Sequence, residues 1–133
     1  MILGIGIDSV EIDRFVSWST FSKEKLLKIF SEHEIEYCLE NSIKSPERFA
    51  ARFAVREAFF KAFCQMAPDN KIPFLTLCKM ISVESAQKGA PQLFVDWPNL
   101  HKKSEVKLDQ EPRCCFSITH TNSHATVLVV IED

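Results

Sequence analysis

Two acidic residues and one lysine have the types and spacing that metal-assisted phosphate chemistry requires. Asp8 lies near the end of an apolar N-terminal segment, and Glu57 lies in a long segment rich in Ala and Phe. Lys61 follows Glu57 by four residues, which is about one helical turn. Mg²⁺ in proteins takes one or two carboxylates plus substrate phosphates, and a lysine can neutralise a phosphate oxygen. The structural alternatives are a strand-end turn residue for Asp8 and an exposed ion pair for Glu57 and Lys61.

A second polar cluster, Ser117-Ile118-Thr119-His120-Thr121, stands at the end of a predicted strand. Histidine side chains ionise near neutral pH and carry two ring nitrogens, which suits them to contact a phosphate or a ribose. The alternative is that His120 only hydrogen-bonds the following turn. The residues alone leave both interpretations open.

Several other chemistries are excluded by spacing. His120 and His124 are four residues apart, but their segment is predicted as strand, turn and strand rather than the helix that such a zinc pair needs. Ser117 has no nucleophile-elbow motif around it. Gly4-Ile5-Gly6 has no third glycine and no helix directly after it, so a dinucleotide fingerprint is also excluded.

A long central helix must position Glu57 and Lys61. Ser45 is a plausible N-cap, Pro46 fits the first helical turn, and Pro68 ends the helix. The segment is apolar around most of its circumference, so we expect the helix to be buried. Small alanines beside Glu57 leave room for a ligand there.

The remaining chain predicts shorter elements, which make the fold class α+β, with a mostly antiparallel sheet packed around the long helix. Gly4 and Gly6 leave one face of the first strand bare, which indicates close packing against another backbone. Ser31 and Glu34 form a capping-box pattern. The predicted strands are 2–12, 74–84, 92–95, 113–119 and 125–131, and the predicted helices before the central one are 22–30 and 31–39. Turns are predicted at 87–91 and 121–123. Loops are predicted at 68–73 and at 97–111, with at most one helical turn in the second loop.

The composition is that of a globular protein. The 133 residues predict one domain, 1–133, and the net charge of −2 argues against bulk nucleic-acid binding. Five cysteines without zinc spacing indicate reduced, buried thiols in a cytoplasmic protein. No signal peptide and no apolar run of the ~20 residues that a membrane span needs are found in the sequence.

Three sequence blocks, in this order, resemble the signatures of the holo-acyl-carrier-protein synthases, which are the small 4′-phosphopantetheinyl transferases. Gly89-Ala90-Pro91 lies between the last two blocks, so the resemblance spans nearly the whole chain. The blocks are Gly4-Ile5-Gly6-Ile7-Asp8-Ser9-Val10-Glu11-Ile12-Asp13-Arg14-Phe15, Arg52-Phe53-Ala54-Val55-Arg56-Glu57-Ala58-Phe59-Phe60-Lys61-Ala62 and Phe116-Ser117-Ile118-Thr119-His120-Thr121.

The resemblance implies Mg²⁺-dependent transfer of the phosphopantetheine arm of coenzyme A to a serine of apo acyl carrier protein, which supports fatty acid biosynthesis. By position, Asp8 and Glu57 match the Mg²⁺ ligands, and Lys61 matches a lysine that touches the phosphates. Glu57 and a metal-bound water both remain candidates for the base. The resemblance further implies a homotrimer with the active site between subunits. The positions matching coenzyme A contacts are Arg52, Lys61, Gly89, Pro91, Ser117, His120 and Thr121, and those matching the carrier-protein docking surface are Arg14, Lys25 and Lys28.

The chain departs from the family pattern at three places. Cys115 replaces the histidine usually found two residues before Ser117, and residues 68–73 replace a glycine-rich loop. Several arginines that relatives carry after the first helix begins are absent here, although Lys23, Lys25 and Lys28 remain. Two alternatives to a transferase are a non-catalytic module that binds a nucleotide or a carrier protein, and a cytosolic interaction protein.

Overall fold

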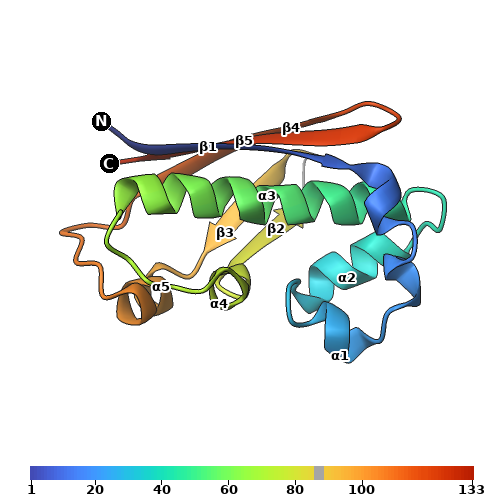
Figure 1. The fold of residues 1–133 in the computed structure, drawn as a ribbon, viewed down its shortest axis with the longest axis horizontal. Helices are drawn as coiled ribbons and strands as arrows, with labels where there is room; N and C mark the ends of the chain where they lie inside the picture. Colours follow the sequence, from blue (N-terminus) through green and yellow to red (C-terminus); the bar gives the residue numbers. More distant parts are fainter. Residues whose placement is uncertain (86–88) are drawn as a thin grey trace.

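One long helix, α3 (Ser45–Met66), lies between a three-stranded sheet and a second layer of shorter elements in the computed structural model, which describes residues 1–85 and 89–133 (Figure 1). The sheet is antiparallel, with strand order β1 (Ile2–Glu11), β5 (His124–Glu132) and β4 (Arg113–His120). The opposite layer contains an antiparallel hairpin of β2 (Ile81–Ser85) and β3 (Pro91–Val95). The predicted α+β class, with antiparallel sheets around a central helix, is confirmed.

The shorter helices complete the second layer and the end of the molecule next to the start of α3 (Figure 1). The 3₁₀ turns η1 and η2 connect β1 to the first short helix, and α2 then leads into α3. These elements are η1 (Ile12–Phe15), η2 (Trp18–Thr20), α1 (Lys23–Leu26), α2 (Glu32–Leu39), α4 (Phe74–Cys78) and α5 (Trp97–Ser104).

The bare glycine face of β1 packs directly on α3, as the sequence predicted. A Cβ atom built at Gly6 would lie 1.8 Å from the carbonyl oxygen of Ala58, and one at Gly4 would lie 2.1 Å from that of Ala62. Both distances are far below van der Waals contact, so only glycine permits this approach. The consequence is that β1 carries Asp8 to the part of α3 that holds Glu57 and Lys61.

The prediction that α3 is central and buried is also confirmed. Phe49, Phe59 and Phe63 have no solvent exposure, and neither does the charged residue Arg56. The predicted capping box at Ser31 is present, with Glu34 as its second member. The predicted N-cap at Ser45 is wrong, because Lys44 occupies that position and the Ser45 hydroxyl is buried without a hydrogen-bond partner among the described residues.

Two elements on the C-terminal side of α3 differ from their predictions. Residues 74–84 do not form one strand, because α4 occupies 74–78 before β2 begins, with Leu77 and Cys78 as its buried face. Residues 97–104 form α5, which is longer than the single helical turn expected at most within the predicted loop 97–111. The Asp96 side chain caps α5 by accepting from the Asn99 amide, a side-chain N-cap that the sequence reading overlooked.

Smaller corrections concern the first predicted helix and the cysteines. Helix 22–30 is reduced to the single turn α1, which the Ser22 side chain caps.

The prediction of buried thiols holds for Cys38 and Cys78, but Cys115 is exposed, because it lies on the sheet face that turns away from α3. Burial raises the pKa of Cys38 and Cys78 to about 12, so both remain protonated thiols at neutral pH. Of the turn predicted at 87–91, residues 87 and 88 lie outside the described residues.

Candidate active site

Lys61 connects α3 to the edge of β1 at Asp8. Its ammonium nitrogen donates to the Asp8 carboxylate oxygen Oδ1 at 3.0 Å and to the carbonyl oxygen of Ile7 at 2.9 Å. One turn further along α3, Gln65 accepts from the amide of Ile5 at 2.7 Å. Two side chains of α3 thus hold the free edge of β1. An ammonium group has three protons, so one proton of Lys61 remains for a ligand.

The Asp8 carboxylate has one oxygen that nothing in the described residues uses. Oδ2 of Asp8 is buried, and no described residue hydrogen-bonds to it. A buried carboxylate oxygen without a partner is costly, and a bound cation would remove that cost. Asp8 therefore fits the requirements of a hard-metal ligand.

Glu57 lies in the same electrostatic environment. Partial burial raises the pKa of the Glu57 carboxyl, and the neighbouring charge of Asp8 raises it further, while Lys61 and Arg14 act in the opposite direction. A carboxyl whose ionisation is disfavoured by a neighbouring carboxylate is typical of a site that receives a cation. The described residues contain no group of three or more His, Cys, Asp or Glu side chains that could hold a metal alone. A Mg²⁺ ion here would therefore need further oxygen ligands from water or from substrate phosphates.

A second group of the sequence-predicted residues lines a cavity of about 230 Å³, here named the Arg52 pocket. Four residues that matched coenzyme A contacts meet there from α3, the β2–β3 hairpin and β4. They are Arg52, Gly89, Pro91 and His120, and the other lining residues are Tyr37, Glu47, Arg48, Ala51, Ser85 and Ile118.

The Arg52 side chain is a buried cation without a counterion in the part of the chain described. It is only 7% exposed, and its guanidinium donates one long hydrogen bond, from Nη1 to the carbonyl oxygen of Arg48 at 3.4 Å. Its Nε is buried and has no hydrogen-bond partner among residues 1–85 and 89–133. Burial of an unpaired charge is unfavourable unless an anion joins it. This pocket is therefore suited to a negatively charged ligand.

His120 contacts Glu47, another residue that lines this pocket, with 3.3 Å between Nε2 and Oε1. His120 therefore does more than hydrogen-bond the following turn, which was the alternative interpretation of this residue. Thr121 has that role instead, because its hydroxyl oxygen accepts from the amides of Ser123 and His124. Ser117 lies on the exposed sheet face opposite Leu128, away from the pocket.

Tyr37 and Arg48 are pocket residues that sequence reasoning missed. Arg48 precedes Arg52 by four residues, so helical spacing alone could have placed both on one face. Tyr37 comes from α2, and no sequence signal connects it with α3.

The two groups of residues lie on different sides of the molecule. Asp8 belongs to β1 and His120 to β4, which are the two edge strands of the sheet. On α3, Arg52 and Glu57 are five residues apart, which corresponds to about 140° around the helix axis. None of Asp8, Glu57 and Lys61 lines the Arg52 pocket.

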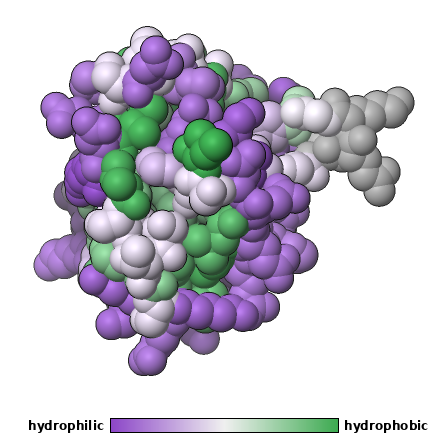
Figure 2. Space-filling view, turned by 90° about the vertical axis from the view of Figure 1, so that its right-hand side faces the viewer, coloured by the Kyte–Doolittle hydropathy of each residue, from purple (hydrophilic) through white to green (hydrophobic). Residues whose placement is uncertain are grey.

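The positions that matched carrier-protein docking surround η1 and α1. Arg14 is exposed, and its guanidinium lies over the ring of Phe53 at 5.1 Å. Its positive charge is also close enough to Glu57 to oppose the rise in the pKa of the Glu57 carboxyl. Lys25 lies over the ring of Phe21 at 3.8 Å, and Lys28 is exposed. Figure 2 shows this end of the molecule, where apolar patches alternate with hydrophilic side chains.

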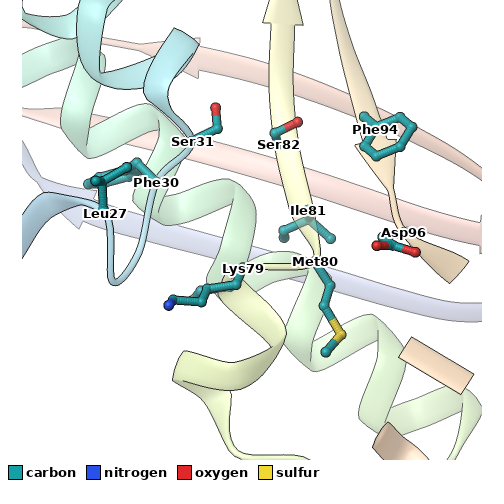
Figure 3. A pocket seen from close by; sticks show the side chains of 10 residues that line it. Leu27, Phe30, Ser31, Lys79, Met80, Ile81, Ser82, Phe94 and Asp96 are labelled. Atoms are coloured by element: carbon teal, nitrogen blue, oxygen red, sulfur yellow. The ribbon is translucent and has the colours of Figure 1, made fainter. Parts of the chain in front are cut away.

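A separate cavity of about 300 Å³ contains none of the residues predicted for the site. It lies between the segment that joins α1 to α2 and the β2–β3 hairpin (Figure 3). Polar and apolar surface contribute about equally to its lining: Leu27, Phe30, Met80 and Ile81 are apolar, and Lys79 and Asp96 are its charged residues. Among the described residues, no helix combines the length and the apolar character that crossing a membrane requires.

Comparisons with known proteins agree with this arrangement. A sequence model of the 4'-phosphopantetheinyl transferase superfamily matches residues 4–128. The holo-[acyl-carrier-protein] synthase of Chloroherpeton thalassium is 34% identical over 130 residues, covering 96% of this chain and 96% of the relative. That of Trichlorobacter lovleyi is 35% identical over 134 residues, covering 99% of this chain and 98% of the relative.

Solved structures extend the similarity to the fold. The ACPS–CoA complex of Chronobacterium ammoniagenes has a TM-score of 0.75 at 26% identity, with 97% of this chain and 96% of that chain covered. The holo-(acyl-carrier-protein) synthase of Bacillus anthracis in complex with CoA (3',5'-ADP) has a TM-score of 0.68 at 27% identity, with 99% and 97% covered. The chain therefore belongs to the holo-[acyl-carrier-protein] synthases of the 4'-phosphopantetheinyl transferase superfamily, the family that its three sequence blocks resemble.

Proposed function

We propose that this protein transfers the 4′-phosphopantetheine arm of coenzyme A to a serine of apo acyl carrier protein, in a Mg²⁺-dependent reaction that releases adenosine 3′,5′-bisphosphate. The reaction would supply holo carrier protein for fatty acid biosynthesis in the cytoplasm. The observation that carries the proposal is the convergence of Asp8, Glu57 and Lys61, with one Asp8 oxygen that has no partner among the described residues.

The carboxylates and the lysine have separate roles in this reaction. Asp8 and Glu57 would hold Mg²⁺, which when bound neutralises charge on the pyrophosphate of coenzyme A. Lys61 is held in place by Asp8 and the carbonyl of Ile7, so its free proton can be directed at a phosphate oxygen. This orientation is fixed before substrate binds, which reduces the reorganisation needed during transfer.

The nucleotide end of coenzyme A fits the Arg52 pocket. Arg52 supplies a buried positive charge without a counterion among the described residues, and His120 lines the same pocket. Gly89 has a positive φ of 88°, a conformation that favours glycine, and it lines the pocket beside Pro91. Two structurally similar family members are described as complexes with CoA, which supports the same ligand for this chain.

The separation of the two residue groups supports a site shared between subunits. Because Asp8 and His120 lie at opposite edges of the sheet, a neighbouring subunit could bring its Arg52 pocket to Asp8 and Glu57 through a head-to-tail contact. The sheet face that turns away from α3 offers an apolar surface for such a contact, since Ile5, Ile7 and Leu128 are 45%, 59% and 41% exposed. We infer a closed ring of three subunits.

Mass spectrometry of apo acyl carrier protein incubated with coenzyme A and Mg²⁺ tests the proposed function. A mass gain of one phosphopantetheine group is expected with the wild-type protein and not after chelation of Mg²⁺. Asp8→Asn and Glu57→Gln should each abolish the gain while circular dichroism shows a folded protein. Gln65→Ala is the matched control, because Gln65 also contacts β1 from α3 but has no charge. Binding of both substrates without any mass gain would instead identify a non-catalytic binding module.

A further inference from the structure

The ring of Tyr37, the single tyrosine of the chain, lies against two arginines at the wall of the Arg52 pocket. The guanidinium carbon of Arg48 is 3.9 Å from the ring centroid, and that of Arg52 is 4.3 Å from it. Tyr37 belongs to the second half of α2, and both arginines belong to the first turns of α3. The aromatic ring therefore joins two helices through two cation–π contacts.

The two arginines need such a contact, because their positive charges lie on the same face of α3. Like charges four residues apart destabilise a helix. Arg48 is anchored by hydrogen bonds from Nη1 to the carbonyl oxygen of Tyr37 at 2.6 Å and to Oε2 of Glu40 at 3.3 Å. Arg52 has no carboxylate partner among the described residues. The Tyr37 ring is thus the group of α2 that attracts both charges.

We propose that Tyr37 is a positioning residue that holds Arg48 and Arg52 side by side, so that both guanidiniums bind the 3′-phosphate of coenzyme A. This inference rests on the proposed function, because it assigns the ligand of the Arg52 pocket. An aromatic ring suits the task better than a carboxylate would. It attracts guanidiniums through its electron-rich face but leaves their N–H donors free for a phosphate.

The ring, rather than the hydroxyl group, carries this role. The structure gives the Tyr37 hydroxyl no hydrogen bond to a described residue, and the side chain is partly exposed at 36%. Tyr37→Phe should therefore keep the two cation–π contacts, while Tyr37→Leu should remove them and preserve an apolar side chain. The pair of variants separates the ring from both the hydroxyl and the bulk of the residue.

Calorimetric titration with coenzyme A and with 3′-dephospho-coenzyme A tests the inference without depending on turnover. For Tyr37→Leu, the Kd for coenzyme A should rise about five- to tenfold, the range expected when one or two cation–π contacts are lost. The Kd for the dephosphorylated ligand should stay within about twofold, a difference of about 0.4 kcal/mol. Tyr37→Phe should bind both ligands as the wild type does. Leu39→Ala, an exposed apolar residue in the same helix, is the matched control and should also be unchanged.

The outcomes separate this inference from the proposed function. If the wild-type protein binds coenzyme A, and Tyr37→Leu weakens both ligands equally or neither, the positioning role is wrong and the proposed function stands. If Tyr37→Phe is as weak as Tyr37→Leu, the ring is not the active feature and the inference is overturned. A wild-type protein that binds no coenzyme A would overturn the proposed function itself. Thermal melting of each variant verifies that the compared proteins are folded.

Discussion

Glu34 and Arg56 form a two-pronged ion pair from which solvent is completely excluded. The distances are 2.8 Å from Nη1 to Oε2 and 2.6 Å from Nη2 to Oε1, and both side chains are 0% exposed. The remaining hydrogen bonds of Arg56 reach the carbonyl oxygens of Arg52, Cys78 and Ile81. Glu34 also accepts from the amides of Ser31 and Val83. The pair thus connects α2, α3, α4 and β2, and it fixes α2 beside the Arg52 pocket.

Removing one partner of this pair should destabilise the protein severely. Arg56→Met leaves the Glu34 carboxylate buried without its counterion, and we expect a loss of about 3–5 kcal/mol in the free energy of unfolding. Urea denaturation measures the loss. The control is Glu32→Gln, which removes the exposed pair of Glu32 and Lys23 and should cost less than about 1 kcal/mol. Equal effects of the two variants would contradict the importance of the buried pair.

The ion pair of Glu34 and Arg56 also predicts how the stability of the protein depends on pH. Burial by itself raises the pKa of Glu34, but the hydrogen bonds and the charge of Arg56, with the amides of Ser31 and Val83, outweigh burial and lower it. A carboxyl whose pKa is lowered by folding stabilises the protein above its unfolded pKa of about 4.3, and the contribution disappears as the pH falls through the folded pKa.

We therefore expect the difference in Tm between wild type and Glu34→Gln to be largest near pH 7 and to shrink steadily below about pH 4. Differential scanning calorimetry across that range provides the measurement. A difference in Tm that stays constant down to the acid limit would mean that Glu34 is not ionised in the folded protein.

Gly6→Ala should disrupt the packing of β1 on α3. The added methyl group would lie 1.8 Å from the carbonyl oxygen of Ala58, which is backbone and cannot rotate away. Overpacking by one methyl group typically costs about 1–3 kcal/mol. Because this methyl group would meet rigid backbone, we expect the free energy of unfolding to fall by more than about 3 kcal/mol. Gly89→Ala is the comparison, because its methyl group would meet no atom of the described residues within 4 Å, and the positive φ is unfavourable by about 1–2 kcal/mol. If Gly6→Ala were the milder change, the close approach of β1 to α3 would be wrong.

Carrier-protein docking should depend on the basic residues around α1. Lys28→Glu should raise the apparent KM for acyl carrier protein and leave that for coenzyme A nearly unchanged, because charge complementarity acts mainly on association. Arg14→Glu should raise the same KM, and its proximity to Glu57 predicts an additional fall in kcat. Steady-state kinetics with each substrate varied separately distinguishes the two effects. A Lys28→Glu variant impaired equally for both substrates would indicate a folding or assembly defect instead.

Complementation between inactive variants should reveal whether the site is shared. Glu57→Ala lacks a metal ligand, and His120→Ala lacks a pocket contact, so each variant alone should be inactive. If a site combines one subunit's Glu57 with its neighbour's His120, an equal, randomly reassembled mixture should recover about one quarter of wild-type activity. If each subunit carried its own complete site, the mixture would stay inactive. Light scattering that found a fully active monomer would also exclude the shared site.

The sequence by itself determined the features that depend on local pattern. The apolar circumference of 48–63 predicted a buried helix, and Gly4 and Gly6 predicted a close backbone contact, because only residues without a side chain allow one. The Ser31–Glu34 capping box was readable for the same reason, since both partners lie within one helical turn. Three blocks of sequence were enough to indicate the family.

Only the tertiary structure decided which of these residues meet. Arg52, Gly89, Pro91 and His120 meet in the Arg52 pocket, whereas Lys61 lies at the edge of β1, because β1 and β4 are opposite edge strands of the sheet, an order that the family blocks do not specify. The contact of Tyr37 with Arg48 and Arg52 joins two helices, and the ion pair of Glu34 with Arg56 spans 22 residues. Local sequence patterns describe neighbours within a turn or along a strand, whereas partners this far apart are chosen by packing of the whole chain.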